Sequence, residues 1–310
     1  MPENSVTTTS EIKFLATLFL LLAIFLTGSY VLNVKREQAH QTATLSAHSF
    51  PPVSLQAKAA YVYDARTQTV LFALNENTRM PLASLTKLMS ALVAEELAPA
   101  YGTVTVSQES LLPDGDNGLK VGEKWSLQDL LDFSLVTSSN DGIHTVALAL
   151  GALEHSQATP KEAVNDFVGK MNRKANELNL KNTYFWNESG LDESEVKGGA
   201  YGTARDIATL LNYILVSQPE LLEATQKAET TFSSDKYNHR AKNTNSLANE
   251  IPGLLASKTG FTDTAGGNLA FVFDPELGRP IIVSILGSTS AGRFADARTL
   301  IAATLEYINK

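Results

Sequence analysis

The sequence predicts an α/β (α+β) fold: an antiparallel five-stranded sheet flanked by helices, with a mostly α-helical lobe inserted into it. Two observations support this prediction. Strand-like segments rich in β-branched and aromatic residues lie near both ends of the chain. Between them, apolar residues recur every three or four positions, which is typical of helices. Strands that enclose helices in this way imply one sheet assembled from the N- and C-terminal parts of the chain.

The predicted strands and helices follow from short local patterns. The strands, bounded by turn residues, are 59–64, 69–74, 256–262, 268–274 and 280–286. Apolar faces at helical spacing predict helices over 81–97, 161–180 and 293–308. The same spacing predicts two helices within 126–150, separated by a turn at 138–142, and the opening of a further helix over 203–211. Thr203 precedes the last of these and is a suitable N-cap.

Composition limits the class of protein. The chain has 310 residues, of which 44% are hydrophobic, so it can bury a sizeable core. Its net charge of -8 argues against a nucleic-acid partner, which would require a basic face. The absence of cysteine excludes disulfides and thiolate sites, and five scattered histidines make a zinc site improbable. We therefore expect neither a metal nor another cofactor.

Residues 14–34 contain no charged side chain and are long enough to span a bilayer. No small-residue cleavage site follows directly, so we expect a retained membrane anchor, with a cleaved signal peptide as the alternative. A buried core helix is improbable because the segment is apolar on all sides. The expected organisation is a tail at 1–13, the anchor at 14–34, a polar linker at 35–53 and a catalytic domain at 54–310. Positive charges are balanced on the two sides of the anchor, so they do not predict its orientation.

A serine and a lysine lie three residues apart at Ser84 and Lys87, at the start of an apolar segment. On a helix such residues are neighbours, and a hydroxyl beside an amine is a workable activated nucleophile. The same Ser-x-x-Lys pattern also occurs at Ser10, Ser194 and Ser233. Those three copies lie among polar residues or before the apolar segment, and only Ser84 opens a helix that is predicted to be buried.

Two further motifs follow in order, Ser138-Ser-Asn140 and Lys258-Thr-Gly260. Each is weak alone, but the ordered set resembles the penicillin-binding protein and serine β-lactamase superfamily. Within it, the chain is most similar to the low-molecular-weight D-alanyl-D-alanine carboxypeptidases. Supporting stretches include Ser139-Asn-Asp-Gly142, and the resemblance covers residues 55–310. It implies the β-lactamase/transpeptidase-like fold.

The resemblance implies a role for each motif. Ser84 would attack the carbonyl between two D-alanines and form an acyl-enzyme, with Lys87 as its base. Ser138 would relay a proton to the departing nitrogen, and Asn140 would hold Lys87 and the substrate amide. The backbone N–H groups of Ser84 and Phe261 would form the oxyanion hole.

The substrate of this family ends in a free carboxylate, so the resemblance also implies a cationic clamp. Lys258, Thr259 and Gly260 would line the substrate. Arg293 would bind the carboxylate, the alternative being that it is a plain surface charge at a helix start. We expect Lys258, together with burial, to lower the pKa of Lys87 toward the neutral amine that a base requires.

The expected activity is that of a serine D,D-carboxypeptidase acting on peptidoglycan stem peptides that end in D-Ala-D-Ala, with β-lactam antibiotics as covalent inhibitors. The alternatives are a D,D-endopeptidase of cross-links, a β-lactamase or esterase, and a non-catalytic penicillin-binding sensor. Ala175 stands where β-lactamases of one class have a deacylating glutamate, which disfavours that activity. We expect the catalytic domain to lie outside the bacterial cytoplasmic membrane. Because many relatives carry a C-terminal anchor and this chain ends at Lys310, we expect residues 14–34 to do the anchoring.

Overall fold

The computed structural model describes residues 28–29, 49–115, 118–153 and 157–310. The predicted anchor and most of the predicted linker lie outside these described residues. Contacts divide the chain into a unit of residues 52–305 and a unit of residues 1–51 with 306–310. In the smaller unit the rings of Phe50 and Tyr307 pack at a centroid distance of 5.9 Å. None of the helices within the described residues is long and apolar enough to cross a bilayer.

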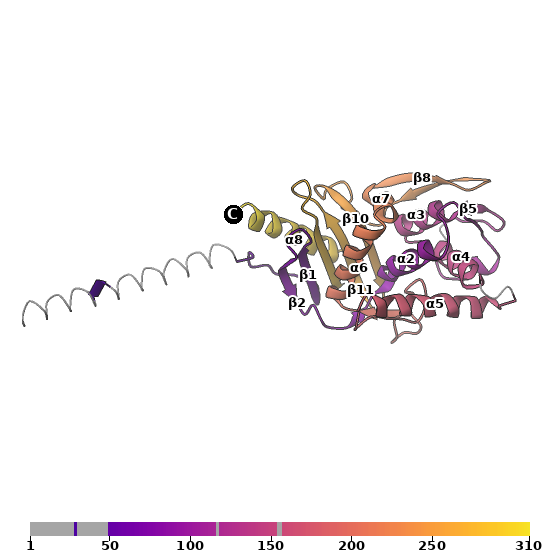
Figure 1. Ribbon diagram of the computed structural model, residues 1–310, viewed down its shortest axis with the longest axis horizontal. Helices are drawn as coiled ribbons and strands as arrows, with labels where there is room; N and C mark the ends of the chain where they lie inside the picture. The colour runs from indigo at the N-terminus through magenta and orange to yellow at the C-terminus, as the bar shows by residue number, and fades with distance from the viewer. Residues whose placement is uncertain (1–27, 30–48, 116–117, 154–156) are drawn as a thin grey trace, which may run out of the picture. The chain divides into compact units, whose positions relative to one another are not determined.

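The larger unit contains the predicted antiparallel sheet (Figure 1). Its strands are β1 (Ala59–Asp64), β2 (Thr69–Leu74), β10 (Leu254–Thr262), β11 (Gly266–Phe273) and β12 (Ile281–Ser288). They lie in the order β10-β11-β12-β1-β2, and every neighbouring pair is antiparallel. The pairing of β1 with β12 joins the two ends of the domain, with Val62 opposite Val283. The predicted five-stranded sheet is therefore confirmed.

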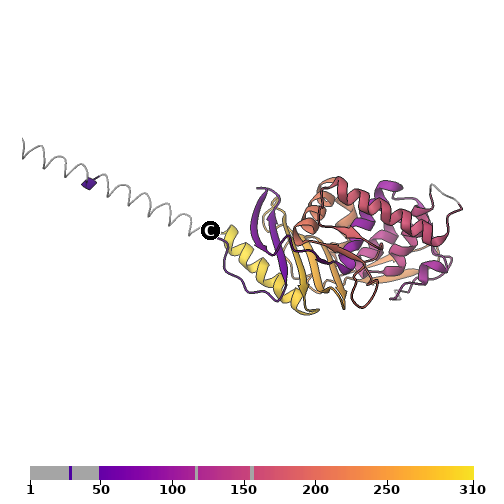
Figure 2. The ribbon, with the colours of Figure 1, turned by 90° about the horizontal axis from the view of Figure 1, so that it is seen from below.

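Helices cover the sheet on both faces. Figure 2 shows α8 (Gly292–Ile308) along one face, while α6 (Ala204–Ser217) and the helical lobe lie on the other. All of β12 is buried, as expected for a central strand covered on both sides. Thr203 caps α6 as predicted, its hydroxyl accepting a hydrogen bond from the backbone N–H of Asp206.

The inserted lobe is built around α2 (Lys87–Leu97), which packs against α3 (Leu127–Thr137), α4 (Asn140–Gly151) and α5 (Pro160–Glu177). Every residue from Lys87 to Ala94 is buried, so α2 is the central helix of the lobe. It is surrounded by protein because its sequence is apolar on nearly all sides. As a result, a charged residue at its first position has no access to bulk water.

The structure corrects the predicted start of the Ser84 helix. Pro81 lies in a short strand, β3 (Met80–Pro81), rather than at a helix start, and residues 83–86 form a 3₁₀ turn, η1 (Ala83–Thr86). Strand β3 pairs with β7 (Ala200–Gly202), which holds the chain extended up to the turn. Tertiary pairing thus overrides the local preference of proline for a helix start.

Several short elements were not predicted. They are β4 (Thr103–Thr105), η2 (Glu109–Leu111), β5 (Lys124–Ser126), β6 (Tyr184–Phe185), α7 (Glu220–Glu223), η3 (Ala224–Gln226), β8 (Glu229–Ser233) and β9 (Asn238–Lys242). The two longest, β8 and β9, form a hairpin in which exposed and buried residues alternate. The inward residues of β9 are His239 and Ala241, so its alternation does not appear as apolar and polar residues in sequence.

Candidate active site

Ser84 lies on the turn η1, between the small strand β3 and the central helix α2. Ala83 has a φ of +48°, which is costly for a residue with a side chain, so the turn needs outside support. Asn268 of β11 supplies part of it: its side-chain N–H group donates to the carbonyls of Pro81 and Leu82 at 3.0 and 3.1 Å. The sheet therefore fixes the turn that presents Ser84.

Two glycines let other segments approach this turn closely. A Cβ on Gly190, whose φ is +82°, would stand 1.9 Å from the carbonyl oxygen of Ala83. A Cβ on Gly260 would stand 2.9 Å from the carbonyl oxygen of Leu82 and 3.1 Å from the backbone nitrogen of Ser84. Strand β10 can therefore run directly beside the serine because the third residue of the Lys-Thr-Gly motif has no side chain.

Lys87 is completely buried and contacts three oxygen atoms. Its Nζ lies 3.0 Å from Ser84 Oγ, 2.7 Å from Asn140 Oδ1 and 2.8 Å from the backbone carbonyl oxygen of Ser189. The last two oxygens can only accept hydrogen bonds. A neutral amine has two protons and one lone pair, so donating both protons to Asn140 and Ser189 leaves the lone pair for the hydroxyl proton of Ser84. The geometry suits a lysine that acts as a base.

Burial lowers the pKa of Lys87 to about 7, against an opposing influence of the Glu188 carboxylate, which raises it. Burial also holds the pKa of Lys258 well below its usual value, and the charges of Lys87 and Arg293 lower it further. The expectation that Lys258 lowers the pKa of Lys87 is therefore wrong. The lowering of the Lys87 pKa comes from burial, and Lys258 is not among the groups that shift it.

The Ser-x-Asn motif joins α3 to α4. Ser138 ends α3 in the left-handed conformation, with a φ of +63°, and Asn140 begins α4. The side-chain N–H group of Asn140 donates to the carbonyl of Asp114 at 2.6 Å, which turns its oxygen toward Lys87. Ser138 Oγ accepts a hydrogen bond of 2.8 Å from Lys258 Nζ. The motif thus contacts both lysines.

The other residues implied by the resemblance lie on β10 and α8. Thr259 donates to the hydroxyl of Thr244 at 2.7 Å, and the side chain of Phe261 is exposed. Arg293 is 9% exposed and donates from Nη1 to the carbonyl of Gly260 at 2.6 Å, so it is not a surface charge. Its Nε is buried and has no hydrogen-bond partner among the described residues. A buried guanidinium with an unused donor is suited to an anion.

The structure thus brings Ser84, Lys87, Ser138, Asn140 and Lys258 together through direct hydrogen bonds. They come from three segments that are far apart in sequence. A nucleophile, a base, a second amine and a buried guanidinium in one place are the parts needed for acyl transfer.

Sequence reasoning missed several groups that hold this site in place. They are the backbone carbonyls of Asp114 and Ser189, the side chains of Asn268 and Thr244, and the Glu188 carboxylate. A carbonyl has no sequence signature because every residue carries one. The Ser-x-x-Lys copies at Ser194 and Ser233 span exposed segments: Ser194 forms an isolated β-bridge with Lys197, and Ser233 ends β8.

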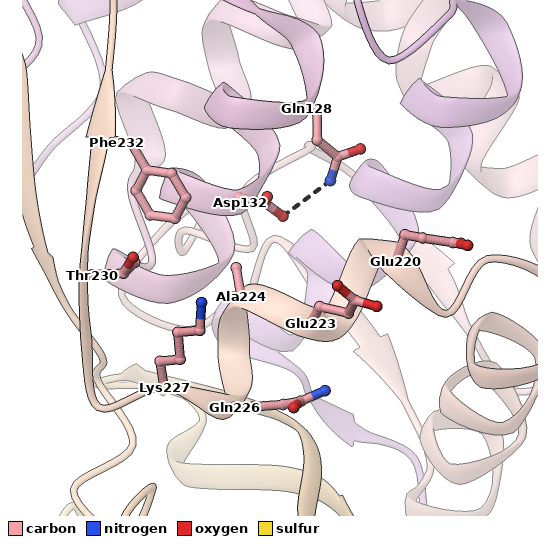
Figure 3. A pocket seen from close by; sticks show the side chains of 9 residues that line it. All are labelled: Gln128, Asp132, Glu220, Glu223, Ala224, Gln226, Lys227, Thr230 and Phe232. Atoms are coloured by element: carbon pink, nitrogen blue, oxygen red, sulfur yellow. Dashed lines mark hydrogen bonds between the residues drawn. The ribbon is translucent and has the colours of Figure 1, made fainter.

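A separate cavity of about 650 Å³ lies in the lobe, lined by residues of α3, α7, η3 and β8 (Figure 3). Its lining residues are Gln128, Asp132, Glu220, Glu223, Ala224, Gln226, Lys227, Thr230 and Phe232, none of which was predicted as a site residue. Burial raises the pKa of Asp132 to about 7, and its contact in Figure 3 is a hydrogen bond from Gln128. Among the described residues, the hydrogen-bond partner of this carboxyl is thus an amide rather than a hydroxyl or an amine.

Comparisons with known proteins agree with the site. A family model described as D-alanyl-D-alanine carboxypeptidase matches residues 43–289. The chain is 32% identical over 224 residues to a D-alanyl-D-alanine endopeptidase of Pseudomonas aeruginosa, covering 68% of this chain and 65% of that protein. It is 30% identical over 222 residues to D-alanyl-D-alanine carboxypeptidase DacF of Bacillus subtilis, covering 68% and 52%. The alignments therefore span about half to two thirds of the length of these relatives.

Among solved structures, penicillin-binding protein D2 of Listeria monocytogenes in an ampicillin-bound form superposes with a TM-score of 0.69. The two chains are 31% identical, and the match covers 82% of this chain and 99% of that one. The architecture described above, an antiparallel sheet with an inserted helical lobe, is thus that of penicillin-binding proteins.

Proposed function

This chain belongs to the D-alanyl-D-alanine carboxypeptidase family, and from this premise we propose that it is a serine D,D-carboxypeptidase that removes the terminal D-alanine from peptidoglycan stem peptides. The observation that carries the proposal is the environment of Lys87. Its buried amine lies 3.0 Å from Ser84 Oγ and is held by two acceptor oxygens. Burial brings its pKa to about 7, where a neutral amine is available.

In the proposed reaction Ser84 Oγ attacks the carbonyl between two D-alanines while its proton passes to Lys87. The oxyanion is held by the backbone N–H groups of Ser84 and Phe261. When the C–N bond breaks, the leaving amine takes a proton from Ser138, which regains one from the protonated Lys258 that hydrogen-bonds it. D-alanine departs and an ester on Ser84 remains. Lys87 then releases its proton to solvent and Lys258 takes one up. Water attacks the ester with neutral Lys87 as the base, the shortened peptide leaves as an acid, and Ser84 Oγ takes back a proton from Lys87.

The carboxylate of the terminal D-alanine would lie against Arg293, whose buried Nε has no partner among the described residues. Thr259 and Lys258 line the same strand. The negative charge of the substrate favours the protonated form of Lys258, whose pKa is low in the empty site because of burial and of neighbouring cations. Substrate binding would therefore keep Lys258 protonated, and this proton would reach the leaving amine through Ser138.

Release of D-alanine from a peptide ending in D-Ala-D-Ala tests the proposal. Wild-type protein should release D-alanine and form a covalent adduct with labelled penicillin. Ser84→Ala should do neither, while Ser194→Ala, which alters an exposed copy of the same motif, should do both. Labelling that survives Ser84→Ala would place the nucleophile elsewhere.

A second candidate is a D,D-endopeptidase that opens peptidoglycan cross-links, because the relative from Pseudomonas aeruginosa is named an endopeptidase. The same residues would act on a peptide bond whose leaving amine belongs to another stem peptide. Mass spectrometry of the products from a muropeptide mixture separates the two. Loss of one alanine from monomers supports the carboxypeptidase, whereas conversion of dimers to monomers without that loss supports the endopeptidase. Rapid turnover of penicillin would favour a β-lactamase.

We also propose that residues 14–34 anchor the catalytic domain on the outer side of the bacterial cytoplasmic membrane. Their length and lack of charge support this, and the substrate of the family lies outside that membrane. The full chain should remain with membranes after an alkaline carbonate wash, and a chain starting at residue 35 should not. A full chain that the wash releases would overturn the proposal.

A further inference from the structure

A second pair of titratable side chains, Glu188 and His144, lies close enough to Lys87 for the carboxylate to act on its charge. Nδ1 of His144 lies 2.7 Å from Oε1 of Glu188, and the carboxylate is almost fully buried. The pair is not part of the three motifs that carry the family resemblance. It nevertheless lies on two of the segments that hold the amine of Lys87, α4 with Asn140 and the segment with Ser189.

The spacing along each segment shows this. His144 lies one turn after Asn140 on α4, and Asn140 accepts a hydrogen bond from Lys87. Glu188 directly precedes Ser189, whose carbonyl accepts another. Ser90 lies one turn after Lys87 on α2 and donates to the backbone carbonyl of Glu188 at 2.6 Å. Two of the three contacts of the Lys87 amine thus come from residues that neighbour the pair on its own segments.

We propose that Glu188 and His144 act as a positioning pair that sets the charge of Lys87, and with it the pH range in which Ser84 can be activated. This inference rests on the proposed function of Ser84 and Lys87. Glu188 is the carboxylate that acts on Lys87, opposing the effect of burial on its pKa. With a neutral imidazole the pair carries one negative charge. With a protonated imidazole it carries none, so the support that it gives to a charged Lys87 disappears.

Histidine is the side chain that changes charge between pH 5 and 8, the range in which Lys87 titrates. The buried charged groups on α4 and on the helices packed against it are Lys87 on α2, Asp141 on α4, and Lys170 on α5, which is paired with Asp166. When the imidazole of His144 carries a proton, its charge opposes the hold of Glu188 on the proton of Lys87. The pair would therefore extend the working range of the base toward acid pH.

The test measures the rate of acylation by labelled penicillin from pH 4.5 to 9.5, in the full chain. Glu188→Gln removes the negative charge, so the acid limb of the profile should move to lower pH by about one unit or more. His144→Gln keeps a hydrogen-bond donor but cannot become charged, so the pair stays negative and the limb should move to higher pH. Opposite shifts from the two partners are not expected of a merely structural contact.

The chain offers a matched control in a second buried pair of the same kind, His239 and Glu123, at 2.8 Å. His239→Gln and Glu123→Gln should lower the rate at all pH values or leave it unchanged, without moving the limb. Glu188→Asp keeps the charge and should restore the wild-type profile. Profiles of the Glu188 and His144 variants that only scale down, or that shift in the same direction, would overturn the proposal.

A second measurement separates this inference from the proposed function. Titration of Lys87 by ¹⁵N-lysine NMR, with its signal assigned by the Lys87→Arg variant, reports its charge whether or not penicillin reacts. If the wild-type protein forms no adduct but its Lys87 midpoint moves in opposite directions in Glu188→Gln and His144→Gln, the proposed function fails and the positioning pair stands. A midpoint that is unchanged in both variants overturns the positioning pair, even if acylation proceeds.

Discussion

Lys87 at the candidate active site and Asp132 at the cavity in the lobe have similar pKa values but different hydrogen-bond partners. Burial lowers the pKa of Lys87 and raises that of Asp132, so that both arrive at about 7. Lys87 faces a hydroxyl and two acceptor oxygens, whereas Asp132 accepts a hydrogen bond from one amide N–H group, that of Gln128. A perturbed pKa therefore identifies burial, and it identifies a catalytic group only where a reacting partner is in contact.

The largest expected effect is the loss of acylation rate when Lys87 is replaced, with replacement of Asp132 as the comparison. Lys87→Ala should lower the acylation rate by ~10²–10⁴-fold, because general-base assistance contributes about that much. Asp132→Ala should change the rate by less than about twofold. The measurement is the rate constant for covalent labelling by penicillin, with circular dichroism to show that both variants fold. Similar losses in the two variants would remove the distinction between the sites.

The next effect concerns the buried guanidinium. Arg293→Gln should reduce acylation by about 10–100-fold, because a hydrogen bond to a charged group contributes ~1.5–3 kcal/mol. Lys227→Gln is the matched control, since Lys227 lines the other cavity. We expect it to have little effect on the same rate. If a substrate amide that lacks the terminal carboxylate reacts equally well with wild type and Arg293→Gln, while the free acid does not, Arg293 binds the carboxylate.

The smallest effect is on stability and belongs to Asp132. Its pKa is raised from 3.8 to about 7, so the folded state binds more protons than the unfolded state between these values. Stability from this group is therefore present at acid pH and is lost as pH rises through 7, by at most about 4 kcal/mol. Asp132→Asn should raise the free energy of unfolding by ~1–4 kcal/mol at pH 8 and leave it unchanged at pH 4. Urea titrations at the two pH values test this, and an equal gain at both would contradict it.

Much of the fold could be predicted because its strands and helices have strong local patterns. The helix at 161–180 was predicted from its apolar face and forms as Pro160–Glu177. The sheet was predicted because the strands at both ends are rich in Val, Ile and aromatic residues. The strand at Pro81 could not be predicted, since β3 depends on pairing with residues 200–202, more than a hundred positions away.

The residues of the candidate site could likewise be predicted only in part. The side chains of Ser84, Lys87, Asn140 and Lys258 could be proposed because their motifs are specific as an ordered set. The carbonyl of Ser189 and the carboxylate of Glu188 could not, since their role depends on which backbone lies beside Lys87 in the folded chain. The lowered pKa values of Lys87 and Lys258 also depend on burial, which sequence spacing does not provide.

The pH dependence of acylation in the wild-type protein tests the central claim, that the neutral amine of Lys87 activates Ser84, most directly. The rate constant for labelling by penicillin should rise with pH through a midpoint near 7, the pKa that burial gives to Lys87. Below this midpoint the amine holds its proton and cannot accept that of Ser84. A rate that continues to rise to a midpoint near that of an ordinary lysine, about 10.4, would contradict the account.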